Sequence, residues 1–151
     1  MRYADPMIIA RTCLLLLTCA LLVALPARAD DLELGMHALE NGYVRRAIEL
    51  WTPLAEQGNA EAQFGLGVIH NDAVGVPQDY AEANYWFLRA AEQGYAPAQF
   101  ILGNAYKNGT GFSEDAGMAV IWWRKAAEQD FAPAQFNLGT ALIEGVGVPR
   151  D

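Results

Sequence analysis

The stretch AEQGYAPAQF, residues 91–100, has a near-copy 36 residues to either side, AEQGNAEAQF at 55–64 and AEQDFAPAQF at 127–136. Identity at this spacing extends beyond the ten residues. The positions identical in all three copies are Ala47, Ala55, Glu56, Gln57, Ala60, Ala62, Gln63, Phe64, Leu66, Gly67, Gly75 and Asp79, with their partners at plus 36 and plus 72. A fixed period of this length predicts a solenoid that stacks one repeated supersecondary unit.

The first half of the unit has the pattern of an amphipathic helix. Asp79 is a good N-cap, and Glu82 stands three residues on, where it can close a capping box. The residues Ala83, Trp86, Ala90 and Ala91 then recur on one helical face. Gly94 ends this helix because glycine adopts the left-handed conformation without penalty. Asp130 stands at the corresponding place in the third copy, so we expect a slightly strained turn there.

The second half of the unit is another helix. It starts near Pro97, at an early-helix position that proline tolerates, and ends in KNGTGF, whose glycines turn the chain toward Asp115. The repeated ten residues are therefore the end of one helix, a turn and the start of the next. They recur because each helical hairpin must present the same docking surface to its neighbour.

We divide the chain by this period into a leader at 1–29, an N-terminal capping helix at 30–42, and repeats at 43–78, 79–114 and 115–151. Pro53 falls inside the first helix of the first repeat, where a kink is expected. At the other end, the helix at 133–143 would expose Phe136, Leu138 or Leu142 to solvent. Either the chain is part of a longer array, or this open end is an interface through which the protein self-associates.

These motifs resemble the Sel-one-like repeat family, 36-residue relatives of tetratricopeptide repeats. The resemblance rests on YWFLRAAEQGYAPAQFILG and VGVPQDY and covers nearly all of the chain after the leader. It implies an all-α fold, a right-handed α-solenoid of stacked antiparallel helix pairs, and a non-enzymatic scaffold that binds a protein or peptide. Some secreted relatives bind or hydrolyse β-lactams, which is the alternative enzymatic reading. Those relatives are rich in cysteine.

The N-terminus reads as a secretory signal peptide. Arg2 and Arg11 precede the apolar run TCLLLLTCALLVALPA, which small residues and Asp30 follow. A membrane anchor would need about 20 apolar residues, and this run is shorter. A lipoprotein would need Cys19 as the lipidated residue, and Thr18 before it fits poorly. We therefore expect a periplasmic or secreted protein with no stable membrane span, translated from either Met1 or Met7.

Charge and cysteine usage narrow the function further. Removal of the leader takes away three of the 10 basic and one of the 18 acidic residues, which leaves 7 basic, 17 acidic and a net charge of −10. Such a surface repels phosphate backbones, so nucleic acid is not an expected partner. Both cysteines lie in the leader, which excludes disulfides and thiolate chemistry from residues 30–151.

The sequence shows no recognisable catalytic or cofactor site. His37 and His70 are far apart, and neither HExxH nor a phosphate-binding glycine loop occurs. We read the recurring glutamates Glu56, Glu92 and Glu128 as structural, because an active site is needed once and a docking contact once per repeat. The tryptophans recur with the same period, which favours a core role over a carbohydrate platform.

Partner binding should use first-helix positions that do not recur. The variable sets, aligned across the repeats, are Arg46, Glu82 and Met118; Glu49, Tyr85 and Ile121; and Pro53, Arg89 and Lys125. Their i, i+3, i+7 spacing places them on one face of each first helix, which we expect to line a concave surface. We predict that Tyr85, Arg89, Met118, Ile121 and Lys125 bind the partner, since aromatic and arginine anchors dominate interfaces.

Overall fold

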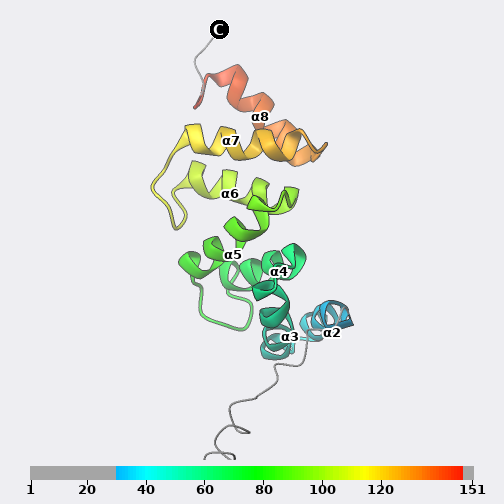
Figure 1. The fold of residues 1–151 in the computed structure, drawn as a ribbon. Helices are drawn as coiled ribbons and strands as arrows, with labels where there is room; N and C mark the ends of the chain where they lie inside the picture. Colours follow the sequence, from blue (N-terminus) through cyan, green and yellow to red (C-terminus); the bar gives the residue numbers. More distant parts are fainter. Residues whose placement is uncertain (1–29, 148–151) are drawn as a thin grey trace, which may run out of the picture.

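The protein is described from a computed structural model that places residues 30–147. These residues form α-helices and no strand. The helices are α2 (Asp30–Glu40), α3 (Val44–Glu56), α4 (Ala60–Asn71), α5 (Tyr80–Glu92), α6 (Ala96–Asn108), α7 (Ala116–Ala127) and α8 (Ala132–Glu144). They stack in chain order from α2 and α3 to α8, each packed on its sequence neighbours (Figure 1). The predicted all-α solenoid of helix pairs is confirmed, while the leader at 1–29 lies outside the described residues.

The helix ends follow the predicted caps. Asp79 accepts hydrogen bonds from the backbone N–H groups of Ala81 and Glu82, both at 3.0 Å, and so caps α5. The reciprocal half of the capping box is absent: the Glu82 carboxylate accepts from Trp86 Nε1 at 2.8 Å instead. The Asp130 turn adopts the left-handed conformation expected of it, with φ of 61°.

Successive second helices, α2, α4, α6 and α8, are held by one aromatic residue from each first helix, α3, α5 and α7. The aromatic residues are Trp51, Phe87 and Trp123, each at most 2% exposed. A Cβ on Gly35 would overlap the Trp51 ring, one on Gly67 the Phe87 ring and one on Gly103 the Trp123 ring. Glycine is therefore required at the three contacts because each ring lies directly on the helix backbone.

In the first two repeats, the size of the ring and the size of the residue at the position of Gly65 change in opposite directions. Trp51 faces Gly65, where a Cβ would lie 2.6 Å from ring atom Cζ3. The smaller Phe87 shares its hydrophobic cluster with Ile101, the residue that corresponds to Gly65. A large ring with glycine in one repeat is thus replaced by a smaller ring with isoleucine in the next, so the larger side chain at one position accompanies the smaller at the other.

Glutamine side chains connect neighbouring repeats. Gln63, fully buried, donates to the carbonyl of Ala55 at 2.8 Å, and its own side-chain oxygen accepts from Gln93 at 2.7 Å. Gln99 and Gln129 repeat the arrangement one unit further along. The repeated sequence AEQ…AQF therefore encodes a ladder of hydrogen bonds as well as a turn.

The recurring glutamates do not make the predicted docking contacts. Glu56, Glu92 and Glu128 are exposed, and their carboxylates form no hydrogen bond or ion pair within residues 30–147. The contact that recurs once per repeat belongs to the glutamines beside them. The glutamates supply charge to the surface rather than contacts between repeats.

The last helix exposes the apolar face that the sequence predicts. Phe136 is 75% exposed and Leu142 48%, while Leu138 packs against the third hydrophobic cluster. Ile143, not among the predicted residues, is the most exposed large apolar side chain of the described part, at 83%. Within residues 30–147 nothing packs over this face of α8 as α7 packs over α6.

Candidate protein-interaction surface

The five predicted binding residues lie on two successive first helices, Tyr85 and Arg89 on α5 and Met118, Ile121 and Lys125 on α7. We call this set the first-helix stripe. Tyr85 is 50% exposed and Ile121 47%, Lys125 is exposed, and Arg89 and Met118 are half-buried. All five therefore reach the surface.

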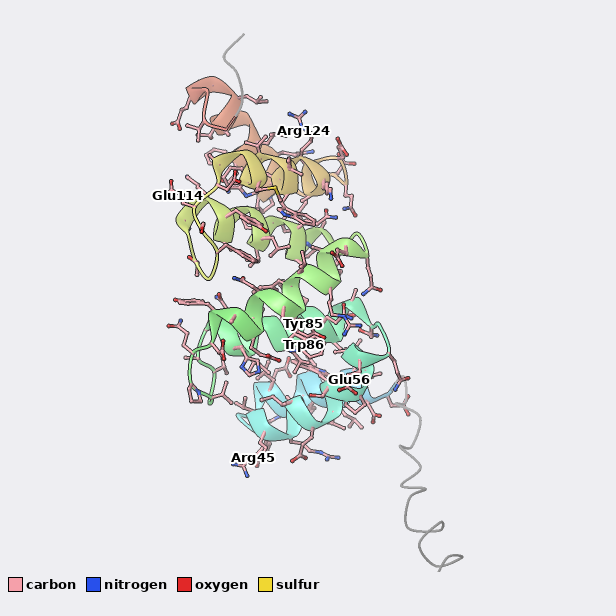
Figure 2. The ribbon with its side chains drawn as sticks, turned by 60° about the vertical axis from the view of Figure 1, so that its left-hand side comes forward. Arg45, Glu56, Tyr85, Trp86, Glu114 and Arg124 are labelled. Carbon is pink, nitrogen blue, oxygen red and sulfur yellow. The ribbon has the colours of Figure 1, made fainter. Side chains whose placement is uncertain are left out.

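On α5 the stripe is a connected cluster. Arg89 donates a hydrogen bond from Nη1 to the Tyr85 hydroxyl at 3.1 Å. Its guanidinium carbon lies 5.8 Å from the centre of the Tyr85 ring and 5.7 Å from that of Trp86, and the two rings meet edge to face at 4.8 Å. Tyr85 and Trp86 lie together in the middle of the stack in Figure 2. These contacts restrain the Arg89 side chain, so a partner that bound it would cost the side chain less entropy than a freely moving arginine would lose.

On α7 a cation also lies over a tryptophan ring, but the cation is a lysine and the indole N–H lacks a carboxylate partner within residues 30–147. The Lys125 ammonium lies 4.1 Å from the centre of the Trp122 ring, and Met118 packs against the hydrophobic cluster that contains Trp122. Trp122 Nε1 is buried and has no hydrogen-bond partner in the described part of the chain. Its counterpart Trp86 Nε1 has one, Glu82, because the residue that aligns with Met118 is an acid.

The structure adds Trp86 and Trp122 to the predicted residues, because the Arg89 guanidinium lies over the first ring and the Lys125 ammonium over the second. Both are buried, at 7% and 6% exposed, so the prediction that the tryptophans belong to the core is confirmed. The sequence carried a signal that went unused: a lysine or arginine three residues after a tryptophan on one helix lies close enough for a cation–π contact.

Other chemistry-bearing residues do not assemble into a site. His37 is exposed, and its ring Nδ1 lies 2.6 Å from the side-chain amide nitrogen of Asn41, near the end of α2. His70 lies on α4, in its last turn. Residues 30–147 hold no group of three metal-ligating side chains, and none of their helices is both long and apolar enough to cross a bilayer.

Three features define an α-solenoid of about 36-residue units: the stacked helix pairs, the glutamine ladder, and the glycines on which the first-helix rings lie. We call these glycines, Gly35, Gly67 and Gly103, the glycine seats. The Sel1 repeat family matches residues 32–59, 60–95, 96–131 and 132–151. The chain therefore belongs to the Sel1 repeat family. Proteins of this family generally mediate protein–protein interactions.

Solved structures agree with this assignment. A Sel1 repeat protein from Oxalobacter formigenes matches 80% of the chain at 37% identity and a TM-score of 0.76. The protein c5321, a protective antigen of uropathogenic Escherichia coli with an SLR fold, matches 83% at 38% identity and a TM-score of 0.76. The match spans 49% of the first protein and 28% of the second. No curated protein matches the chain.

Proposed function

We propose that this protein is a non-enzymatic scaffold of the bacterial cell envelope that binds a protein or peptide through the first-helix stripe. The observation that carries the proposal is Arg89, which is held between the Tyr85 hydroxyl and the Trp86 ring while remaining partly open to solvent. An arginine beside an aromatic residue, both fixed in place, is the composition of an interface anchor.

The charge of the stripe indicates what the partner offers. Arg89 and Lys125 place two cations beside the apolar side chains Tyr85 and Ile121, in a chain whose residues 30–151 are otherwise strongly acidic. A partner segment that carries apolar residues and a carboxylate complements this surface, and the acidic remainder of the molecule repels it elsewhere. The export step and the envelope location rest on the signal-like leader at 1–29.

The test is affinity capture from an envelope extract with residues 30–151 as bait, run beside the double variant Tyr85→Ala, Arg89→Glu. We expect a protein that the unchanged chain retains and the variant loses. A matched control is Tyr43→Ala, Arg45→Glu, which alters the same residue types at the start of α3, where both side chains are exposed.

The control variant should retain the partner. If every captured protein bound the stripe variant as strongly as the unchanged chain, the stripe would be the wrong surface. A circular dichroism spectrum common to all three baits would show that lost capture is not lost folding. Steady turnover of a chromogenic β-lactam would instead support the enzymatic alternative.

A further inference from the structure

An apolar pocket lies mainly among second helices, between α2, α4 and the turn that precedes α6. Its volume is about 210 Å³. We call it the Gly65 pocket; it is lined by Leu32, Met36, Leu39, Trp51, Glu61, Phe64, Gly65, Val68 and Tyr95. Pockets for small-molecule ligands are typically larger, roughly 300–1,000 Å³, so this one suits a single side chain.

The first repeat departs from the other two at two positions that line the pocket. Gly65 corresponds to Ile101 and Asn137; because it has no side chain, the Trp51 ring lies directly against its backbone, and both residues line the pocket. Glu61 corresponds to Pro97 and Pro133, so a carboxylate lines this pocket where the other repeats have proline. The residues that build the repeat are retained while those that shape the pocket change, which is the pattern of a binding site on a repeated scaffold.

The lining combines apolar walls with one acidic group. Trp51, Phe64 and Tyr95 supply aromatic surface, and the Phe64 and Tyr95 rings lie 5.3 Å apart. Glu61 is the one charged lining residue, and its exposed carboxylate makes no hydrogen bond or ion pair within residues 30–147. Burial and, second, the charge of Glu61 raise the pKa of the Tyr95 hydroxyl, which places phenol and carboxylate near each other.

We propose that the Gly65 pocket binds the side chain of a lysine from a partner polypeptide. The apolar stem of lysine would lie against Leu32, Val68 and the aromatic rings, as such stems do on apolar surfaces. The ammonium would meet Glu61 and the Tyr95 hydroxyl and gain from the aromatic faces around it. The net charge of −10 on residues 30–151 favours a cationic partner segment over a neutral one.

The probe is Nα-acetyl-lysine methylamide, with its Nζ-acetyl derivative as the uncharged match, titrated into the ¹⁵N-labelled protein. Lysine should cause saturable NMR shifts of the Phe64 and Val68 amides. The Nζ-acetyl compound should bind at least about tenfold more weakly, because a hydrogen bond to a charged group contributes more than one to a neutral group. Glu61→Gln should weaken the lysine probe by a similar factor.

The filled-pocket control is Trp51→Phe with Gly65→Ile, which installs the pair found as Phe87 and Ile101 in the next repeat. This variant should keep the helical spectrum and lose the lysine shifts. The stripe variant Tyr85→Ala, Arg89→Glu should keep them, so failure here and failure of the proposed stripe are separable. Equal shifts from the acetylated probe, no saturable shift from lysine, or undiminished binding by the filled-pocket variant would each overturn the assignment.

Discussion

The side-chain amide of Gln129 donates a hydrogen bond to the side-chain oxygen of Gln99, at 2.8 Å, across the boundary between two repeats. Gln99 is only 4% exposed, and its side-chain amide donates in turn to the carbonyl of Ala91 at 3.0 Å. The turn of one helix pair is thus tied to the turn of the next. Because buried polar groups must be paired, the two glutamines are constrained together.

Replacing Gln99 with alanine should lower the free energy of unfolding by about 1–3 kcal/mol, because Ala91 and Gln129 both lose a partner near the core. Urea unfolding followed by circular dichroism measures the change. Gln135→Ala is the matched control. Gln135 occupies the same position on α8 but is exposed and bonds Ala127 at 3.3 Å, so its loss should cost less than about 0.5 kcal/mol. Equal losses at the two positions would contradict a ladder that depends on burial.

The fold was predictable because its signals are local and recur. The N-cap Asp79, the turn residue Gly94 and the early-helix Pro97 each specify backbone geometry within a few residues, and the structure places all three as expected. The partner of Glu82 was not predictable, since a carboxylate at that position can reach either the backbone N–H of Asp79 or the Trp86 indole. Side-chain packing selects the indole, and packing is not visible in a local pattern.

The size exchange between Trp51 and Gly65 gives a second prediction. Gly65→Ile alone should destabilise the protein by roughly 1–3 kcal/mol, because the new Cβ would lie 2.6 Å from the indole ring. Combined with Trp51→Phe it should recover much of that loss, since the pair then matches Phe87 and Ile101. Thermal or urea unfolding of both single variants and the double variant measures the coupling. Simple additivity of the two losses would show that the residues do not compensate.

A third prediction concerns the Trp122 indole, whose Nε1 has no hydrogen-bond partner among residues 30–147. Met118→Glu would place a carboxylate at the position that corresponds to Glu82, which accepts a hydrogen bond from Trp86. The new carboxylate could accept from Trp122 Nε1 but not from a phenylalanine at position 122. The effect of Met118→Glu on the free energy of unfolding should therefore be about 1 kcal/mol more favourable with Trp122 present than with Trp122→Phe. The measurement is a double-mutant cycle of Met118→Glu with Trp122→Phe, followed by urea unfolding. A coupling of zero would mean that the carboxylate does not reach the indole.

Tyr95 gives a prediction about pH. Its pKa is raised above the ordinary 10.0 by burial and by Glu61, so the unfolded chain ionises at lower pH than the folded protein. The stabilising contribution is complete below pH 10.0 and is lost as pH rises through the higher folded value. Tyr95→Phe, which installs the residue found at Phe131, should therefore lose less stability than the unchanged protein between about pH 8 and pH 11. Unfolding titrations at both pH values test this, and identical losses would contradict it.

The candidate site was predictable only in outline. Variation at aligned first-helix positions singled out Tyr85, Arg89 and Lys125 as candidates, and the structure shows that all three side chains reach the surface. The same comparison could have found Glu61 and Gly65, which also break the repeat. The sequence comparison alone does not show a pocket there, because the lining also depends on how α2, the Trp51 ring and the Tyr95 turn pack around these two residues, and that is a property of the packed structure.

The glycine seats supply the last prediction, which distinguishes an uncovered α8 from one covered by a further helix. Gly103→Ala should cost about 1–3 kcal/mol because the Trp123 ring lies on that backbone. Gly139 is its counterpart on α8, and a Cβ there meets no atom within 4 Å among the described residues. Gly139→Ala should therefore stabilise the protein by up to about 1 kcal/mol, the difference in helix propensity between the two residues.

Calorimetry of the two variants beside the unchanged protein measures the contrast. If another first helix covers α8, from a longer chain or from a second molecule, its aromatic residue would occupy the Gly139 seat as Trp123 occupies that of Gly103. Gly139→Ala would then be destabilising as well. Opposite signs for the two substitutions therefore indicate that α8 is a free end of the solenoid, and equal signs indicate that the array continues over it.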